Sequence, residues 1–123
     1  MPLFLKVEKN FMPTNFPLAP ASKTVDGLVA VPMDIQQLQA SIIFDGATQV
    51  PPVVASLTFI TGNIHGCAVF DLRQTITSAL LDGTAIAVAN LAHHNFGGGA
   101  NADMRIINLS LPANTTHTLQ LNY

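Results

Sequence analysis

The chain has 123 residues, of which 49% are hydrophobic and only 10% are charged, and its formal net charge is −2 at pH 7. This length fits one domain with a core of its own, and so apolar a composition argues against intrinsic disorder. The basic residues (Lys6, Lys9, Lys23, Arg73 and Arg105) are scattered along the chain, so the clustered positive charge that binds nucleic acid or an anionic membrane is missing.

The low charge also predicts what the surface contacts. A typical domain carries about 25% charged residues, so we expect neutral or apolar surface that faces a protein partner or identical subunits. A surface of Thr, Asn and Gln is the alternative. The cellular location stays unknown, with the cytoplasm as the default, because Cys67 is the only cysteine and the apolar start MPLFLK is too short for a secretion signal. No apolar run approaches the ~20 residues of a membrane span.

Residues 1–24 are predicted to form an extended arm ahead of a single domain over residues 25–123. The first twenty residues hold four prolines and three phenylalanines. Proline excludes a regular helix or a central strand there. The phenylalanines nevertheless need cover, so the arm is expected to pack on a surface.

From residue 25 onward, short apolar runs with period-two alternation predict strands, and turn signals such as Asp82-Gly83 separate them. In the last long run before the C-terminal strand, Ile107, Leu109 and Leu111 are expected to share one face. The predicted strands cover residues 53–61, 67–72, 75–81, 84–91, 104–111 and 117–123. Residues 33–41 stay open between strand and helix, because Ile35 and Leu38 fall at the spacing of a helical turn.

Strands that arrive every ten to fifteen residues, with no long helical period between them, indicate a sandwich or barrel. The predicted fold is therefore all-β. We expect an antiparallel β-sandwich, jelly-roll-like or a partly open barrel, with the extended N-terminal arm.

The stretch HHNFGGGANAD, residues 93–103, is the part of the chain that most resembles a ligand site. The metal-ligand candidates are His93, His94 and Asp103, with His65 as a recruit from elsewhere. Adjacent histidines on a strand point to opposite faces, and neither HExxH nor a CxxC pair occurs in the chain. The glycines match neither a phosphate-binding loop nor a dinucleotide fingerprint. The favoured interpretation is a strand-to-strand connection, without metal or cofactor.

Two further pairs lie two residues apart, a spacing that puts both side chains on one face of a strand. Asp71 and Arg73 are expected to form a structural ion pair rather than an acid–base pair, because no second carboxylate stands at a defined spacing. Cys67 and His65 could form a thiolate–imidazolium pair. Since Cys67 begins an apolar strand, a buried and unreactive thiol is the favoured interpretation.

The runs Leu80-Leu81-Asp82-Gly83, Leu109-Ser110-Leu111-Pro112 and Leu119-Gln120-Leu121-Asn122-Tyr123 carry a resemblance to a known family. Over about half the chain they resemble the N-terminal β-domain of the aminopeptidase N-like zinc metallopeptidases. The resemblance implies a non-catalytic front module. The HExxH and GxMEN motifs of that family belong to a following domain and do not occur in this chain, so no site residue carries over.

Composition and motifs together predict a non-catalytic β-sandwich interaction module that packs against a partner domain or identical subunits. A structural jelly-roll or decoration subunit of a viral shell is the first alternative, since an extended arm suits gripping a neighbour. A module that binds a small ligand or a carbohydrate is the second alternative. With no Trp and one Tyr, however, stacking platforms for sugars are scarce. No residue is expected to be catalytic.

Overall fold

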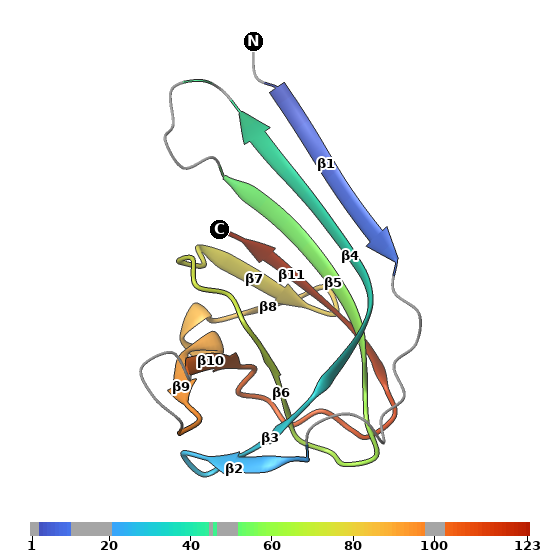
Figure 1. Ribbon diagram of the computed structural model, residues 1–123, viewed down its shortest axis with the longest axis vertical. Coiled ribbons are helices and arrows are strands. Elements are labelled where there is room, and N and C mark those ends of the chain that lie inside the picture. The colour runs from blue at the N-terminus through green and yellow to red at the C-terminus, as the bar shows by residue number, and fades with distance from the viewer. Residues whose placement is uncertain (1–2, 11–20, 45, 47–51, 98–102) are drawn as a thin grey trace.

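The computed structural model describes residues 3–10, 21–44, 46, 52–97 and 103–123 as an all-β sandwich of two sheets (Figure 1). The larger sheet has the strand order β1-β4-β5-β11-β7-β8 and the smaller sheet the order β2-β3-β6-β10-β9. The strands are β1 (Leu3–Asn10), β2 (Lys23–Val25), β3 (Leu28–Val31), β4 (Met33–Phe44), β5 (Val53–Thr61), β6 (Cys67–Phe70), β7 (Ser78–Leu81), β8 (Thr84–Ile86), β9 (His93–Asn95), β10 (Asp103–Ile106) and β11 (Thr116–Asn122). Over these residues the predicted sandwich is confirmed, and every strand pairing is antiparallel except the parallel pairing of β3 with β6.

The predicted N-terminal arm is, over Leu3–Asn10, an edge strand of the larger sheet. β1 pairs with β4 along its whole length, from Leu3 opposite Phe44 to Asn10 opposite Gln37. The segment Leu3–Asn10 contains no proline, and it lies at the edge of the sheet. Both observations fit the rule that prolines keep a segment out of the centre of a sheet. Residues 11–20 of the arm lie outside the described residues.

The segment left open between strand and helix is the long strand β4. Its register against β5 shifts between Ile35, which lies opposite Phe59, and Gln37, which lies opposite Thr58. This β-bulge inserts one extra residue, so Ile35 and Leu38 face the same side although they are three residues apart. The helix-like spacing of Ile35 and Leu38 in the sequence is therefore explained by a β-bulge.

Two predicted strands end early because contacts from distant segments interrupt them. The predicted strand 84–91 divides into β8 and a 3-10 helix, η2 (Val88–Leu91). The predicted strand 104–111 ends at Ile106, because the amide of Asn108 donates to the carbonyl of Asn90 and that of Leu109 donates to Ile107. Leu109 is 52% exposed, so its expected place beside Ile107 and Leu111 was wrong.

The predicted strand 67–72 likewise ends at Phe70, and the predicted strand 75–81 begins only at Ser78. The strands predicted over 53–61 and 117–123 are confirmed as β5 and β11. Both carry buried residues at every second position, as alternation predicts.

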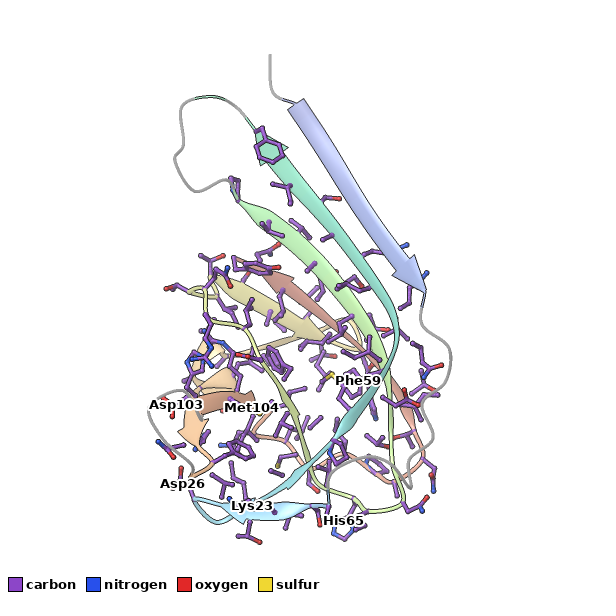
Figure 2. All side chains as sticks on the ribbon, viewed as in Figure 1. Lys23, Asp26, Phe59, His65, Asp103 and Met104 are labelled. Atoms are coloured by element: carbon purple, nitrogen blue, oxygen red, sulfur yellow. The ribbon has the colours of Figure 1, made fainter. Side chains whose placement is uncertain are left out.

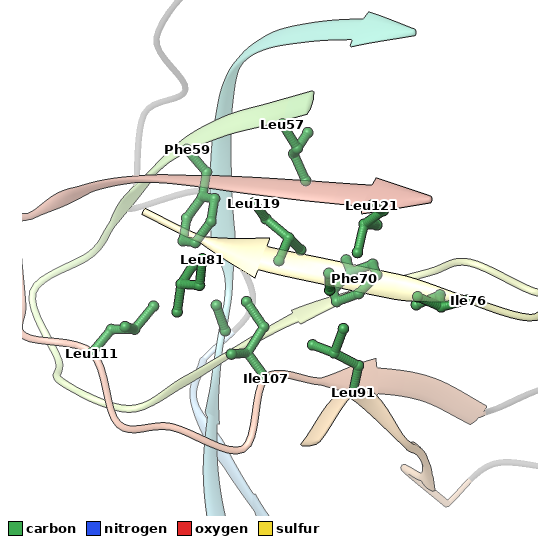
Figure 3. Close-up of a cluster of buried hydrophobic side chains, with 12 residues drawn as sticks. Leu57, Phe59, Phe70, Ile76, Leu81, Leu91, Ile107, Leu111, Leu119 and Leu121 are labelled. Atoms are coloured by element: carbon green, nitrogen blue, oxygen red, sulfur yellow. The ribbon is translucent and has the colours of Figure 1, made fainter. Parts of the chain in front are cut away.

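The main core lies between the two sheets (Figure 3). Leu57 of β5 lies directly opposite Leu119 of β11, and Phe59, next on the same face of β5, is fully buried. The other labelled core residues are Phe70, Ile76, Leu81, Leu91, Ile107, Leu111 and Leu121. A second cluster, of Val25, Ala30, Cys67 and Ile106, uses the other face of the smaller sheet. The smaller sheet is therefore apolar on both faces.

Two Asp-Gly pairs form two-residue hairpin turns. Asp26 and Gly27 have φ of 50° and 81° between β2 and β3, and Asp82 and Gly83 have φ of 51° and 81° between β7 and β8. Positive φ at both central residues is the geometry that suits the right-handed twist of a hairpin. Each turn holds its aspartate at the tip of a hairpin, where the carboxylate meets a histidine from another part of the chain.

Candidate functional site

The four predicted metal-ligand candidates do not come together. His93 and His94 lie in β9, where the Nε2 atom of His93 is 3.0 Å from the carbonyl oxygen of Leu72. The Nδ1 atom of His94 is 2.7 Å from Asp26 Oδ2, at the tip of the β2–β3 turn. The two imidazole rings therefore form hydrogen bonds with different parts of the chain. Among the residues that the structure describes, no group of three or more His, Cys, Asp or Glu side chains could hold a metal ion.

The other two candidates lie apart from each other. Asp103 begins β10 opposite Asn95, whereas His65 is exposed in the loop before β6, at the opposite end of the smaller sheet (Figure 2). The stretch from His93 to Asp103 connects two paired strands, as predicted, although its two histidines belong to the strand itself. Residues 98–102, with two of the three glycines, lie outside the described residues.

Asp71 and Arg73 form the predicted ion pair, with Arg73 Nε 3.0 Å from Asp71 Oδ1. They follow β6 rather than continue it, and both side chains are more than half exposed. An exposed pair of this kind contributes little to stability. It provides no acid–base chemistry of its own.

Cys67 is buried and His65 is exposed, so the possible thiolate–imidazolium pair is not formed. Burial raises the pKa of the Cys67 thiol, against the opposing effect of a backbone hydrogen bond from Leu109. A thiol with a raised pKa stays protonated at neutral pH, and the protonated form is a poor nucleophile. The prediction of a buried, unreactive cysteine agrees with this geometry.

The best-organised polar cluster is one that sequence reasoning missed. His117 of β11 places its Nδ1 atom 2.6 Å from Asp82 Oδ2 and its Nε2 atom 2.7 Å from Thr115 Oγ1. Asp82 also accepts a 2.8 Å hydrogen bond from the amide of Thr118 through Oδ1. The imidazole packs on the ring of Phe59 with a centroid separation of 5.6 Å. An Asp-Gly turn and a histidine on a neighbouring strand were the signals that could have indicated it.

A carboxylate, an imidazole and a hydroxyl in this order resemble a catalytic triad. Here the hydroxyl has a second acceptor within reach besides His117 Nε2, because Thr115 Oγ1 also lies 2.8 Å from the carbonyl oxygen of Pro112. The amide of Thr115 donates to the Oγ1 atom of the fully buried Thr61, which in turn donates to Pro112. These bonds close the turn before β11. The cluster therefore joins that turn to the β7–β8 hairpin by hydrogen bonds.

The same cluster shifts the ionisation of Asp82. Partial burial acts to raise the pKa of Asp82, but hydrogen bonds from His117 and the Thr118 amide, with the charge of His117, outweigh it, so the pKa is lowered. The carboxylate is thus held ionised, which suits an acceptor that receives two donors.

Arg105 is a buried cation that acts as a clamp. Its guanidinium donates from Nε to the carbonyl of Leu72, from Nη1 to Leu91 and from Nη2 to Gln74, at 2.7 to 2.8 Å. Burial lowers the pKa of Arg105, yet an arginine remains charged in proteins. Its donors satisfy three carbonyls of irregular backbone, so this charge is structural.

A cavity of about 410 Å³ lies between the two sheets and beside the main core. Its walls come from β4, β5 and β11 of the larger sheet and from β6 and β10 of the smaller one. The lining residues are Met33, Ile35, Leu38, Ala55, Leu57, Val69, Phe70, Asp71, Leu72, Met104, Leu121 and Tyr123. Among the described lining residues, Asp71 and Tyr123 alone carry polar side-chain groups, so these walls are almost wholly apolar.

A smaller cavity of about 220 Å³ lies against the β2–β3 side of the smaller sheet. Val69 and Met104 line both cavities, so the two cavities adjoin at these residues. Lys23 lies at the rim of the smaller cavity, where its ammonium group donates to the carbonyl of Phe96. The two cavities therefore lie next to each other and share Val69 and Met104 as lining residues.

The apolar lining of the larger cavity continues onto an uncovered part of the larger sheet. β1, the C-terminal half of β4 and the start of β5 extend beyond the smaller sheet (Figure 1). Here Ala40 and Ile42 of β4 lie opposite Ala55 and Val53 of β5, on the face that Leu38 shares with the core. We call this the inner face of the extension, made up of Leu38, Ala40, Ile42, Phe44 and Val53.

Comparisons with family models, with curated proteins and with solved structures found no match to this chain. Within the described residues, no helix has the length and apolar character needed to cross a membrane. The features of the described residues that bear on function are the cavity, the inner face of the extension and the polar clusters.

Proposed function

We propose that the protein is a non-catalytic β-sandwich interaction module that packs against identical subunits, or against a partner domain, through the inner face of the extension. The observation that carries the proposal is the uneven coverage of the larger sheet. Its inner face beyond the smaller sheet presents Ile42 and Val53, which are partly exposed, and Phe44, which is 38% exposed.

The two faces of the extension differ in character. Along β4 the inner face carries Leu38, Ala40 and Ile42, whereas the outer face carries Gln37, Gln39 and Ser41. Toward the tip the outer face also has two apolar residues, Ile43 and the 40% exposed Val54 of β5, so the contrast holds for the part of the extension nearer the core. Alternation of this kind is typical of a sheet with one face packed against something and the other in water. Contiguous apolar surface rimmed by polar residues is a mark of interaction sites.

The polar clusters support the non-catalytic part of the proposal. The carboxylate of Asp82 and the hydroxyl of Thr115 are bonded to backbone, and the donors of Arg105 satisfy backbone carbonyls. Each cluster joins structural elements, and its groups are occupied in doing so.

The test is the native mass in solution over a range of concentrations, measured by analytical ultracentrifugation on the wild type and two variants. Ile42→Asp places a charge on the inner face, whereas Ser41→Asp places the same charge on the outer face of the neighbouring position. We expect the wild type and Ser41→Asp to associate beyond the 13.0 kDa single chain, and Ile42→Asp to stay a single chain. A wild type that remains a single chain up to millimolar concentration would contradict association between identical subunits.

A further inference from the structure

We propose that the larger cavity binds one uncharged aliphatic molecule, a long-chain alcohol being the simplest example. This site adjoins the inner face of the extension and shares Leu38 with it, so the experiments below are chosen to let the two proposals fail separately. The volume of the cavity, its lining and the placement of its few polar groups support this assignment.

The volume is that of a ligand site. Protein interiors pack closely and leave few voids larger than a water molecule. Pockets for small molecules, in contrast, have volumes of about 300–1,000 Å³. The cavity of about 410 Å³ falls in that range; it opens to solvent on one side, and residues from both sheets line it.

The lining selects an apolar occupant. Leu57 and Leu121 from the larger sheet and Phe70 from the smaller one are typical of its walls. A molecule rich in hydroxyl groups would lose bonds to water and find almost no replacements, which is costly for buried polar groups. This argues against the carbohydrate that the sequence left open. A hydrocarbon chain gives up no hydrogen bonds to water on entry and gains contact with the walls.

The polar groups select against a negative charge. Asp71 lines the cavity and is exposed, so its carboxylate lies where the cavity meets solvent, and Tyr123 carries the other polar group of the lining. The carboxylate can accept a hydrogen bond from an alcohol, whereas a fatty-acid carboxylate would meet a like charge. Arg73 pairs with Asp71 outside the lining and partly offsets that repulsion. The difference between an alcohol and an acid is therefore measurable.

Val69 and Met104, which line both cavities, allow the site to adapt to ligands of different length. Methionine is unbranched and flexible, and its side chain fills irregular spaces. A change of the Met104 side chain would join the larger cavity to the smaller one, because both cavities share this wall. Longer chains can then be accommodated without moving the strands.

The test uses N-phenyl-1-naphthylamine, an uncharged apolar probe whose fluorescence rises in apolar surroundings. We expect saturable binding of one probe per chain. We also expect decan-1-ol to displace the probe at a concentration about tenfold lower than decanoate, the charged analogue. Probe uptake that does not saturate would overturn the proposal, and so would equal displacement by the alcohol and the acid.

Two variants of neighbouring residues locate the site. Ala55→Leu fills the cavity from β5, whereas Ser56→Leu adds the same side chain to the opposite, outer face. We expect Ala55→Leu to weaken probe binding about tenfold or more and Ser56→Leu to leave it unchanged. Equal effects of both variants would overturn the assignment. Leu38→Gln, at a partly exposed lining position, is expected to weaken binding as well, and it serves if Ala55→Leu does not fold.

The same titration on Ile42→Asp separates the two proposals. This variant removes the proposed contact between chains but lies outside the lining of the cavity. We expect its affinity for the probe to equal that of the wild type. If the probe is lost together with self-association, the probe reports an interface between chains, and the cavity assignment is wrong.

Discussion

At the scale of single residues, the protein uses one arrangement twice. Asp26 and Asp82 each sit in an Asp-Gly hairpin turn, and each accepts a hydrogen bond from the Nδ1 atom of a histidine distant in sequence. Because a carboxylate only accepts, Nδ1 carries the proton in both bonds. Each pair therefore fastens the tip of a hairpin to a strand outside that hairpin.

Asp82→Asn is expected to destabilise the fold at neutral pH by about 1 kcal/mol, a figure that allows for the half-exposed side chain. Asparagine tolerates the positive φ of this turn, so the substitution removes the charge and keeps the turn. The pKa of Asp82 is lowered in the folded state. Its contribution is therefore complete above the unfolded value of about 3.9 and is lost as pH falls through the folded value.

Urea unfolding of the wild type and Asp82→Asn between pH 7 and pH 2 checks this expectation. The difference in free energy of unfolding should be constant near neutrality and shrink toward zero in acid. A difference that grows as pH falls would contradict the sign of the shift.

Residue-scale predictions from the sequence succeeded where the partners were near neighbours. The ion pair of Asp71 with Arg73 involves residues two apart, and the burial of Cys67 follows from its own apolar strand. The bond between Asp82 and His117 spans 35 residues. It forms only because β7 and β11 are adjacent in the sheet, which no local pattern encodes.

At the scale of elements, Arg105 holds together parts of the chain that have no regular structure. Its side chain reaches from β10 to the carbonyls of Leu72 and Gln74 in the segment after β6, and to Leu91 at the end of η2. Buried carbonyls of irregular backbone need such donors, because no ladder supplies them. One planar guanidinium serves three acceptors at once.

Arg105→Lys is expected to lower the free energy of unfolding by about 3 kcal/mol. An ammonium group lacks the planar fork that reaches three separate carbonyls, so at least one buried acceptor loses its partner. Thermal and urea unfolding measure the loss. The matched control is Arg73→Lys at the exposed ion pair, which should change stability by less than about 0.5 kcal/mol. Equal effects at both positions would contradict the clamp.

Elements were predictable where alternation was unbroken. β5 and β11 follow the period of two throughout and were placed correctly. β4 was ambiguous because its bulge replaces a spacing of two by a spacing of three. β8 and β10 ended early because hydrogen bonds such as that from Asn108 to Asn90 interrupt them, and such bonds depend on the tertiary fold.

At the scale of the whole molecule, β1 covers the edge of the longest strand. Without it, residues 37–44 of β4 would present unpaired amide and carbonyl groups, which are a template for aggregation. Deletion of residues 1–10 is expected to lower the melting temperature and to cause concentration-dependent aggregation, measured by light scattering. Deletion of residues 1–2, which precede the strand, is the control. A truncated protein that melts like the control and stays monodisperse would contradict a protective role for β1.

The two-layer β architecture was predictable, since strands and turn signals recur at short intervals. The division of the strands between the sheets was not. β3 and β6 pair in parallel although β4 and β5 lie between them in sequence, so their neighbourhood depends on a crossover. The apolar cavity and the inner face of the extension were equally hidden, because each depends on which strands the smaller sheet leaves uncovered.

The position of β11 has a consequence for how the protein is made. This strand lies in the middle of the larger sheet, between β5 and β7, and yet it comes last in sequence among the described strands. During synthesis on the ribosome, β5 and β7 therefore cannot pair with their shared neighbour until Asn122 has left the exit tunnel. During that interval the nascent polypeptide exposes two unpaired edges, and a trailing sequence or a chaperone that delays release would prolong the interval.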